Sequence, residues 1–234
     1  MICAAGASSR MGGIKKEYRL LPGADGNLTV LGAAVSAFAA VAEITIIVIT
    51  VPENPLTGES AARKALPPRL LAGNNTPAIH FVAGGATRQA SVFNALSFLK
   101  HYAPGFVLIH DGARPWVSPS LIGRIIDGVE QFRAAIPLLP LTETPKETDV
   151  PLGDAPVFIK RHLKRAVTGA AQTPQGFAFP DILTAHEQAA AQKGMEEQFT
   201  DDAEVWACFC GPVAAIPGEP ENRKITFPED LCLK

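Results

Sequence analysis

The chain has 234 residues, which is long enough for one large domain with a substantial hydrophobic core. Hydrophobic residues make up 47% of the chain and charged residues 19%, which is the balance of an ordinary folded protein. The formal net charge of -2 gives no overall positive field, so the composition argues against nucleic acid and membrane surfaces as partners.

Short β-branched runs alternate along the chain with Ala- and Leu-rich stretches of helical period. Residues 44–51 (ITIIVITV) are apolar on both faces, which predicts a buried parallel strand. Further strands are predicted at residues 79–83, 106–110, 134–139 and 213–216. Helices are predicted at residues 30–41, 88–100, 119–132 and 180–192, and a turn is predicted at residues 228–231.

This alternation of strands and helices favours an α/β fold with a doubly wound sheet. Right-handed crossovers would bring all the carboxyl ends of the strands to one edge of that sheet. The helix at 119–132 also has a clear start, because Ser118 is a good N-cap and Pro119 suits the first helical position.

The alternation stops at residues 142–169, which are rich in Thr, Pro, Lys and Arg and contain one short apolar run. A structureless loop of this length is improbable inside a compact domain, so the segment is interpreted as a functional arm or lid. The sequence shows no repeat, low-complexity tract or linker. We therefore predict one domain over residues 1–234 that carries this arm.

The four cysteines, Cys3, Cys208, Cys210 and Cys232, are too few and too clustered to form a disulfide framework. No second Cys or His pair accompanies Cys208 and Cys210, so a zinc site is not expected. The longest apolar run is too short to span a bilayer, and the chain does not begin with a basic-then-apolar signal segment. We therefore expect a cytoplasmic protein with reduced thiols.

The first segment that indicates chemistry is A-A-G-A-S-S-R-M-G-G at residues 4–13. Small residues let the backbone pass close to a ligand, and successive amides can form a concave anion site. Arg10 and Lys16 add positive charge to the same loop, a combination that suits a triphosphate. The segment lacks the dinucleotide G-x-G-x-x-G pattern and the G-K-[ST] ending of a P-loop, and a plain surface loop is the alternative.

The second segment is G-G-A-T-R-Q-A-S at residues 84–91, which follows a predicted strand and opens a predicted helix. Paired glycines permit a tight turn that brings the amides of the helix N-terminus to the edge of the sheet. Ser91 falls in the first turn, where its hydroxyl can cap the helix or contact a base. An ordinary strand-to-helix turn is the alternative interpretation.

The third segment is H-D-G-A-R-P at residues 110–115, directly after the predicted strand 106–110. An Asp at the carboxyl end of a strand commonly binds a metal or a hydroxyl, and Arg114 offers a fork for phosphate. The alternative is an ion pair between Asp111 and Arg114 that holds the loop. His110 is interpreted as a packed strand-end residue and not as a catalyst.

Basic residues recur in separate segments further along the chain. Each segment alone could be a turn or a solvated charge run, but a reaction among phosphates needs several convergent cations. These segments are Thr144 with Lys146, the group Arg161, Lys164 and Arg165, T-P-Q at 173–175, T-D-D at 200–202, and N-R-K-I-T at 222–226.

Taken together, these motifs resemble the 2-C-methyl-D-erythritol 4-phosphate cytidylyltransferase family, CTP-using enzymes of the non-mevalonate pathway of isoprenoid biosynthesis. They run in the family's order from residue 4 to about residue 231: A-A-G-x-x-x-R-M, K-x-Y, G-G-x-x-R-Q-x-S-V, H-D-G-A-R-P, T-x-K, T-P-Q, T-D-D and N-x-K-I-T-x-P-E-D-L. The resemblance implies a mostly parallel, Rossmann-like nucleotidyltransferase sheet with a protruding β-arm at about 142–169. It also implies a homodimer formed by exchange of that arm.

The activity that the resemblance implies is transfer of CMP from CTP to 2-C-methyl-D-erythritol 4-phosphate, with release of pyrophosphate. The side chains that would hold the CTP phosphates and stabilise the transition state are Arg10, Lys16 and Lys224. Those that would line or support the site for the base and ribose of CTP are Ala4, Ala5, Gly6, Gly85, Arg88 and Ser91. Those that would bind the acceptor and its phosphate, some of them across the dimer, are Asp111, Arg114, Thr144, Arg165 and Thr173.

The implied chemistry agrees with this inventory of cations. A phosphate monoester is already an anion, so its attack on the α-phosphorus needs no strong base, and the rate enhancement comes from placement and charge neutralisation. Mg²⁺ is implied as the cofactor that accompanies CTP, with Asp111 as a candidate ligand. Residues 200–202 are interpreted as support behind the site.

Three alternatives remain open from the sequence. The first is a cytidylyltransferase for another polyol phosphate, such as ribitol 5-phosphate, on the same scaffold. The second is a nucleotide-sugar pyrophosphorylase that uses another nucleoside triphosphate. The third is a non-catalytic nucleotide-binding module, against which the joint presence of Arg10, Lys16 and Lys224 argues.

The two ends of the chain depart from the family pattern. Residues 1–3 leave almost no strand before the Ala4–Gly6 loop, where the family has a full apolar strand. We expect either a start further upstream or a shortened central strand, which would anchor the CTP loop less firmly. The chain also ends soon after residues 228–231, short of the terminal helix that the family pattern predicts.

Overall fold

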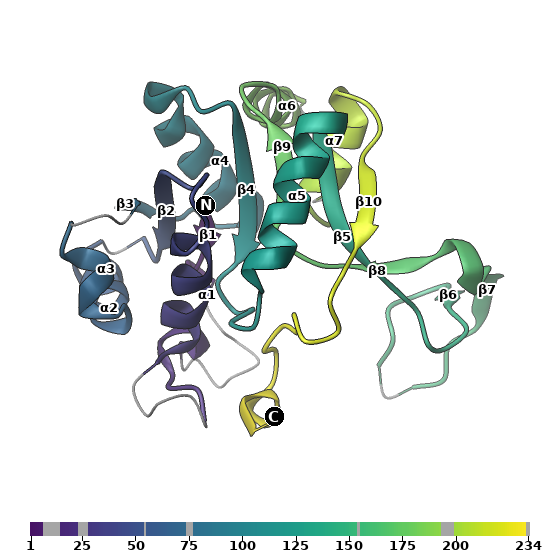
Figure 1. Ribbon diagram of the computed structural model, residues 1–234. Helices are drawn as coiled ribbons and strands as arrows, with labels where there is room; N and C mark the ends of the chain where they lie inside the picture. Colours follow the sequence, from purple (N-terminus) through teal and green to yellow (C-terminus); the bar gives the residue numbers. More distant parts are fainter. Residues whose placement is uncertain are drawn as a thin grey trace.

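The alternating apolar segments fold into a mixed sheet with helices on both faces (Figure 1). The computed structural model describes residues 1–6, 15–22, 28–53, 55–73, 77–153, 155–192 and 199–232. Within these ranges the strands are β1 (Ile2–Cys3), β2 (Ile46–Val51), β3 (Ala78–Ala83), β4 (Phe106–Asp111), β5 (Ala134–Pro140), β6 (Lys146–Thr148), β7 (Ile159–His162), β8 (Gly169–Ala171), β9 (Gln175–Ala178) and β10 (Ala214–Pro217). The α-helices are α1 (Val30–Ala39), α2 (Pro55–Ala65), α3 (Pro68–Leu71), α4 (Arg88–Leu99), α5 (Pro119–Phe132), α6 (Asp181–Ala191) and α7 (Asp202–Phe209). The short 3-10 helices are η2 (Lys16–Tyr18), η3 (Lys100–Tyr102), η4 (Arg165–Val167) and η5 (Pro228–Cys232).

The main sheet has the strand order β10-β5-β9-β4-β1-β2-β3, with β8 also paired to β5. Strands β4, β1, β2 and β3 run parallel to one another, and β10 runs parallel to β5. Strand β9 is antiparallel to both β4 and β5, and β8 is antiparallel to β5. The predicted α/β, mostly parallel sheet is therefore confirmed. The expectation that all strand carboxyl ends meet at one edge is wrong for β8 and β9.

Close packing on both faces explains why the short strand β9 lies in the middle of the sheet. A Cβ atom at Gly176 would be 2.5 Å from the Cγ2 atom of Val129 on α5, so only glycine lets this helix approach. The next side chain, Phe177, points to the other face, where its ring stacks 5.6 Å from the ring of Trp206. The sequence Q-G-F-A is too short to reveal this arrangement by periodicity.

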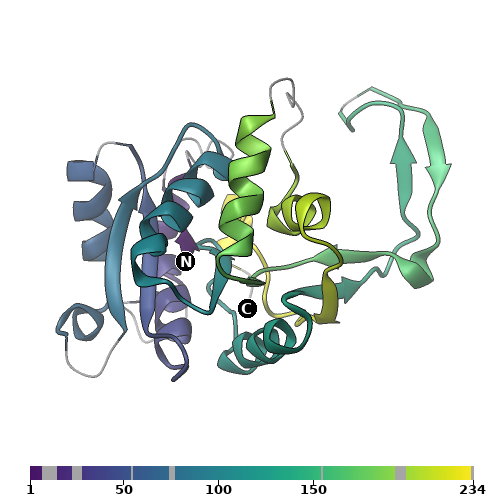
Figure 2. The same ribbon diagram turned by 90° about the horizontal axis from the view of Figure 1, so that it is seen from above.

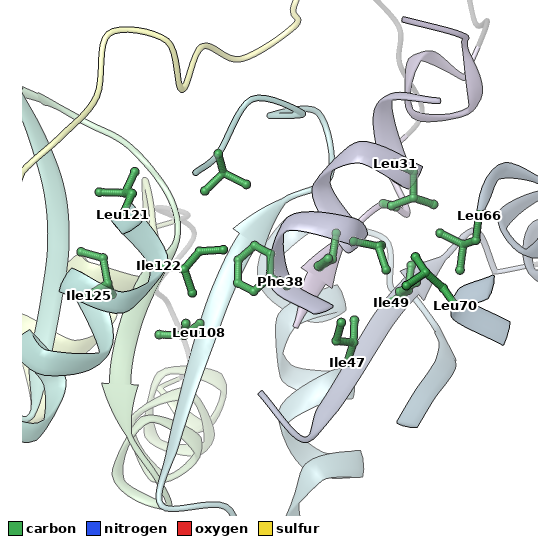
Figure 3. Close-up of a cluster of buried hydrophobic side chains, with 14 of the residues drawn as sticks. Leu31, Phe38, Ile47, Ile49, Leu66, Leu70, Leu108, Leu121, Ile122 and Ile125 are labelled. Carbon is green, nitrogen blue, oxygen red and sulfur yellow. The ribbon is translucent and has the colours of Figure 1, made fainter. Parts of the chain in front are cut away.

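Two hydrophobic clusters cover the two faces of the sheet. Helices α1, α2 and α5 pack on one face, and α4, α6 and α7 pack on the other (Figure 2). Figure 3 shows Phe38 of α1 in the first cluster, with Ile122 of α5 on one side and Ile47 of β2 on the other. All three side chains are fully or almost fully buried, so this cluster fixes both helices on the sheet.

Every element that the sequence predicts is present, with ends within two residues of the predicted ones. The predicted N-cap of α5 is confirmed, because the Ser118 hydroxyl accepts a hydrogen bond from the backbone N–H of Leu121 at 2.9 Å. Helices α2, α3 and α7 were not predicted. Helix α2 (PLTGESAARKA) lacks a regular apolar stripe, and α7 begins at Asp202, inside the T-D-D motif. None of the helices in the described ranges is long and apolar enough to cross a bilayer.

The predicted arm leaves the body of the molecule as a β-hairpin, on the right of Figure 1. Strands β6 and β7 pair with each other and form a separate two-stranded sheet, and β8 leads the chain back to β5. Large apolar side chains on the arm are exposed: Phe158 is 81% exposed and Val167 is 83% exposed. The arm therefore presents an apolar surface that its own chain does not cover.

Candidate active site

A cleft of about 590 Å³ opens where β1, β2, β3 and β4 end. Its lining also includes the start of α4, the short helix η2 and residues 224–226 of the C-terminal segment. The charged residues in the described lining are Lys16, Glu17, Glu53, Arg88, Asp111 and Lys224. Six segments that are far apart in sequence thus converge on one cleft of the size of a small-molecule site.

The A-A-G loop enters the cleft directly from the short central strand β1. Strand β1 lies between β2 and β4, and the Ala4 N–H continues this pairing by donating to both the carbonyl and the hydroxyl oxygen of Thr50, each at 3.2 Å. Ala4 is fully buried beneath the cleft, whereas Ala5 and Gly6 line it. The two-residue strand β1 therefore places the loop at the site.

The G-G loop is held tightly against this segment. A Cβ atom at Gly84 would lie 2.3 Å from the Cβ of Ala5, so a larger residue would displace the A-A-G loop. The Gly85 N–H donates to the Ser91 hydroxyl at 3.0 Å, and that hydroxyl donates to the Thr87 carbonyl at 2.9 Å. The side chain that caps α4 is Thr87, which accepts from the Ala90 N–H, so Ser91 is not the cap and instead fixes the loop from inside.

Asp111 is the electrostatic centre of the cleft. One of its carboxylate oxygens lies 2.9 Å from Lys224 Nζ and 3.5 Å from Arg114 Nε, and the other lies 3.7 Å from Arg88 Nε. Burial alone would raise the pKa of Asp111, but the charges of Lys224, Arg88 and Arg114 outweigh burial and hold the pKa well below its usual range. The carboxylate stays ionised and fixes three cations around it.

A second buried carboxylate supports Arg88 from behind. Arg88 Nη2 donates to Asp202 Oδ2 at 2.8 Å, and His186 Nε2 lies 3.3 Å from the other oxygen of Asp202. Burial alone would lower the pKa of Arg88, but Asp202 and Asp111 raise it above its usual value. The guanidinium is therefore permanently charged and is held between two carboxylates, one in the cleft and one beneath α4.

The alternative interpretation of the H-D-G-A-R-P motif also has support, because Asp111 and Arg114 do form an ion pair. Arg114 further donates from Nη1 to the Asn222 carbonyl at 2.8 Å, so it ties β4 to the C-terminal segment. Thr173 lies behind Asp111, where its hydroxyl accepts from the Asp111 N–H at 3.1 Å. Both residues contact Asp111 but do not line the cleft within one chain.

His110 is a packed strand-end residue, as the sequence analysis interpreted it. Its Nε2 lies 3.1 Å from the Arg114 carbonyl, which can only accept, so this nitrogen carries the proton. Its Nδ1 then accepts from the Thr173 hydroxyl at 3.0 Å. Burial lowers the pKa of His110 to about 4, so the ring is neutral at physiological pH and buttresses Asp111 without carrying charge.

The two lysines with predicted phosphate roles lie in the same cleft. Lys16 Nζ donates to the Ile225 carbonyl at 2.7 Å, and the Ile225 N–H donates to the Ala113 carbonyl at 2.9 Å. Lys224 is therefore next to a residue that links η2 to the end of β4. The side chain of Lys224 is 42% exposed and can reach a bound ligand.

The structure brings together most of the residues that the sequence analysis selected. Those that line the cleft are Ala5, Gly6, Lys16, Gly85, Arg88, Ser91, Asp111 and Lys224. Arg10 lies outside the described residues. Thr144 and Arg165 lie on the arm and do not line the cleft of their own chain; Arg165 donates to the Thr142 carbonyl at 2.7 Å. Their predicted role across a dimer stays a prediction.

Eight residues that line the cleft were not selected from the sequence: Cys3, Glu17, Thr50, Glu53, Ala86, Thr87, Ala113 and Thr226. Cys3, Thr50 and Glu53 lie at or just beyond strand ends, a position that could have marked them, since the parallel strands end at this edge. Glu17 lies within the K-x-Y motif but is buried, and its one-turn helix gave no signal in the sequence.

The described residues contain no group of three or more His, Cys, Asp or Glu side chains placed to hold a metal ion. Mg²⁺ typically binds through one or two carboxylates, substrate phosphates and water, so Asp111 alone is a sufficient protein contribution. Cys3, Cys208 and Cys210, the cysteines whose side chains the structure describes, are all free thiols.

A family comparison matches this chain over its whole length. The model of the family described as "IspD: 2-C-methyl-D-erythritol 4-phosphate cytidylyltransferase" matches residues 1–234. Among curated relatives, a bifunctional enzyme IspD/IspF of Bradyrhizobium sp. (strain ORS 278) is 40% identical over 234 residues, which is 99% of this chain and 54% of the relative. The chain thus spans about half the length of the curated relatives that it matches.

Solved structures show the same relationship. A 4-diphosphocytidyl-2C-methyl-D-erythritol synthase from Anaerococcus prevotii has a TM-score of 0.77 and 26% identity, with 99% of this chain and 93% of that chain covered. A 2-C-methyl-D-erythritol 4-phosphate cytidylyltransferase from Francisella tularensis has a TM-score of 0.74 and 26% identity, with 98% and 94% covered. These similarities confirm the fold class that the motifs predicted.

Proposed function

The chain belongs to the 2-C-methyl-D-erythritol 4-phosphate cytidylyltransferase family, and from this we propose that it transfers CMP from CTP to 2-C-methyl-D-erythritol 4-phosphate. The products would be 4-diphosphocytidyl-2-C-methyl-D-erythritol and pyrophosphate. The observation that carries the proposal is a single cleft, lined by the A-A-G and G-G loops, that holds Lys16 together with Arg88 and Lys224, the last two paired with the ionised Asp111.

The proposed reaction is an in-line displacement at the α-phosphorus of CTP. A phosphate oxygen of the acceptor forms the new P–O bond, and the bond to the pyrophosphate oxygen breaks. Because the attacking phosphate is already an anion, no general base is required, which agrees with the neutral, buried state of His110. Lys16 and Lys224 would neutralise the charge that develops on the phosphates, and Arg10 is proposed to assist them.

The base and ribose of CTP are proposed to lie against Ala5, Gly6, Gly85 and Ser91. All four lie on the A-A-G and G-G segments, which pack so closely that a Cβ atom at Gly84 would lie 2.3 Å from the Cβ of Ala5. A backbone fixed in this way presents its amide and carbonyl groups at constant positions. Rejection of uracil would follow, because a site built to pair one polar edge leaves groups unpaired with another.

Asp111 is proposed to accept hydrogen bonds from the hydroxyls of the acceptor, with Thr173 fixing its backbone. Mg²⁺ is proposed to enter with the CTP phosphates, where it would neutralise charge on the leaving pyrophosphate. The only protein ligand proposed for it is the Asp111 carboxylate. The geometry is compatible with that role, since Asp111 lines the cleft and its carboxylate lies 2.9 Å from Lys224 Nζ.

The exposed apolar arm supports a proposed homodimer. Exposed aliphatic and aromatic side chains of this size on a projecting hairpin are typical of an interaction surface. The arm's large exposed apolar residues are Val150, Leu152, Phe158, Ile159 and Val167. In a symmetric dimer each arm would extend over the partner, and Thr144 and Arg165 would bind the acceptor phosphate in the partner's cleft.

The direct test is pyrophosphate release from CTP and Mg²⁺, measured in parallel with 2-C-methyl-D-erythritol 4-phosphate, with ribitol 5-phosphate and without acceptor. Release only with the first acceptor is expected. The product of that reaction should be identified by mass spectrometry, and UTP, ATP and GTP should replace CTP in matched reactions.

Other outcomes would revise the proposal in specific ways. Release with ribitol 5-phosphate alone would keep the chemistry and change the acceptor. Release with UTP, ATP or GTP in a further reaction that supplies a sugar 1-phosphate as acceptor would indicate a nucleotide-sugar pyrophosphorylase. If calorimetry shows CTP binding but no reaction releases pyrophosphate, the remaining interpretation is a non-catalytic nucleotide-binding module.

A further inference from the structure

A buried glutamine outside the recognised motifs, Gln172, holds the segment that carries Lys224. It follows β8, where the chain returns from the arm to the sheet, and it is 4% exposed. Its Oε1 accepts from the Glu219 N–H at 3.0 Å, and its Nε2 donates to the carbonyls of Glu219 at 2.8 Å and Asn222 at 3.1 Å. Both ends of the side-chain amide are thus used on one stretch of backbone.

The segment at residues 218–226 needs such support because it contains no helix or strand. Its backbone has no regular ladder to fix it, so its position depends on individual ties to the body. A Cβ atom at Gly218 would lie 2.6 Å from Gln172 Oε1, which shows how closely the segment packs on this side chain. At the other end, Ile225 pairs with Ala113.

The position of Lys224 follows from these ties. Lys224 comes two residues after Asn222, whose carbonyl accepts from Gln172 and whose side chain donates to the Thr173 carbonyl at 2.7 Å. A lysine is a flexible chain, so its ammonium group stays near Asp111 only if its backbone is fixed. A displacement of about 1 Å in a catalytic group can lower turnover about 100-fold.

We propose that Gln172 is a positioning residue for the transfer step, acting through Lys224 by fixing the backbone of residues 219–222. Gln172 does not line the cleft, so no substrate contact is assigned to it. The inference rests on the proposed function, because it takes Lys224 as a group that acts on the reacting phosphates.

The chain offers a matched control three residues away. Gln175 is also buried, 1% exposed, and uses both ends of its amide: Nε2 donates to Asp201 Oδ2 at 2.7 Å, and Oε1 accepts from the Ala203 N–H at 3.1 Å. These bonds fix the start of α7 and do not involve the segment that carries Lys224. Gln172 and Gln175 are both buried and both use the two ends of the side-chain amide. They differ in what they hold, which is the segment that carries Lys224 for Gln172 and the start of α7 for Gln175.

The test is a double-mutant cycle on turnover. Gln172→Met keeps the length of the side chain and removes its hydrogen bonds, and Gln172→Ala serves as a second variant. In the wild-type background we expect kcat to fall roughly 10- to 100-fold, because Lys224 loses its placement. In the Lys224→Ala background the same change should alter kcat by less than about twofold.

The control variant separates positioning from a general loss of structure. Gln175→Met should change kcat by the same factor in both backgrounds, because it does not act through Lys224. If Gln172→Met is likewise additive with Lys224→Ala, the inference is overturned. Melting curves of each variant show whether it is folded before its kinetics are interpreted.

A second readout does not depend on activity. Hydrogen exchange followed by mass spectrometry should show faster exchange of the peptide that contains Ile225 in Gln172→Met, and no change there in Gln175→Met. Faster exchange in Gln172→Met, together with a wild type that releases no pyrophosphate, would mean that the proposed function failed while the structural role of Gln172 stands. Unchanged exchange together with an additive cycle, in an active enzyme, would refute the inference alone.

Discussion

The cleft and the arm both pair a carboxylate with several cations, but in opposite surroundings. In the cleft, the buried Asp111 faces Lys224, Arg88 and Arg114. On the arm, Glu147 lies 3.5 Å from Lys160 and 3.3 Å from Arg161, and both cationic side chains are mostly exposed. The charges are similar in number, so the difference lies in burial and in what holds each backbone.

This difference shows which part of the site a single chain can complete. The cleft charges are fixed by strand ends and buried hydrogen bonds, which is the preorganised arrangement that stabilises a transition state. The arm charges lie in water, where ion pairs contribute little and side chains move freely. The cleft is therefore built by one chain, whereas Thr144 and Arg165 become part of a site only if another chain orders them.

The largest expected effect comes from the lysines of the cleft. Lys224→Ala and Lys16→Ala should each lower kcat about 100- to 1000-fold, because each removes a cation from the reacting phosphates. Steady-state pyrophosphate release measures the loss, and melting curves should show that both variants are folded.

The matched control for these lysines is Lys100→Ala, an exposed lysine at the end of α4, which should leave kcat unchanged. Full turnover in both cleft variants would contradict the mechanism. Loss of turnover in only one would show that the cleft relies on a single lysine for charge neutralisation.

The next effect concerns the arm. Arg165→Ala should lower kcat/KM for the acceptor roughly 10- to 100-fold, as expected for one lost charge-assisted contact to a phosphate. The KM for CTP should change little, because the contact proposed for Arg165 is to the phosphate of the acceptor and not to CTP. Kinetics with each substrate varied in turn separate the two effects.

Mixing two inactive variants tests whether the arm acts across a dimer. When Lys224→Ala and Arg165→Ala are co-expressed or refolded together, a mixed dimer contains one site with both wild-type residues. About a quarter of wild-type activity should return if subunits exchange at random. No recovery, with mixed dimers demonstrated by mass spectrometry, would place Arg165 outside the partner's site.

The fold was predictable where long apolar segments dominate. The runs at β2, β4 and α5 have clear periods and caps, and they appeared within two residues of their predicted bounds. Strand β9 was not predictable in the same way, because its position depends on Gly176 meeting Val129 across the sheet. A contact between residues far apart in sequence leaves no local pattern.

The site was predictable as a set of motifs but not as a network. Asp111 and the cations Arg88, Arg114 and Lys224 were each selected, yet no spacing indicates that one carboxylate holds all three cations. Gln172 lies directly beside the T-P-Q motif and was passed over, because its role depends on a segment 47 residues away. Supporting residues of this kind become visible only when the chain is folded.

A smaller effect is expected at the carboxylate behind Arg88. Asp202→Asn should raise the KM for CTP about tenfold, the equivalent of one weakened charge-assisted hydrogen bond. Burial alone would raise the pKa of Asp202, but His186 and Arg88 lower it below its usual value. The stability that this carboxylate contributes is therefore fully present above about pH 4 and is lost as the pH falls through its lowered pKa.

The lowered pKa of Asp202 predicts how the free energy of unfolding depends on pH. As the pH falls below about 4, the free energy of unfolding of the wild type should fall more steeply than that of Asp202→Asn, which has no carboxylate to protonate. Urea denaturation at closely spaced pH values measures both slopes. Parallel slopes would mean that Asp202 is not the buried carboxylate that the fold keeps ionised.

The smallest effect is expected at Glu147, the carboxylate on the arm that pairs with two cations. Glu147→Gln should change the free energy of unfolding by less than about 1 kcal/mol, because its partners Lys160 and Arg161 are mostly in water. The change should shrink further at high salt, whereas the effect of Asp202→Asn should persist, since buried pairs are screened less. Both variants can be compared in the same denaturation series, at a protein concentration below and another above the dimerisation midpoint. If Glu147→Gln is as destabilising as Asp202→Asn only at the higher concentration, the partner subunit buries the ion pairs of Glu147. The contrast between cleft and arm then holds for the single chain but not for the dimer.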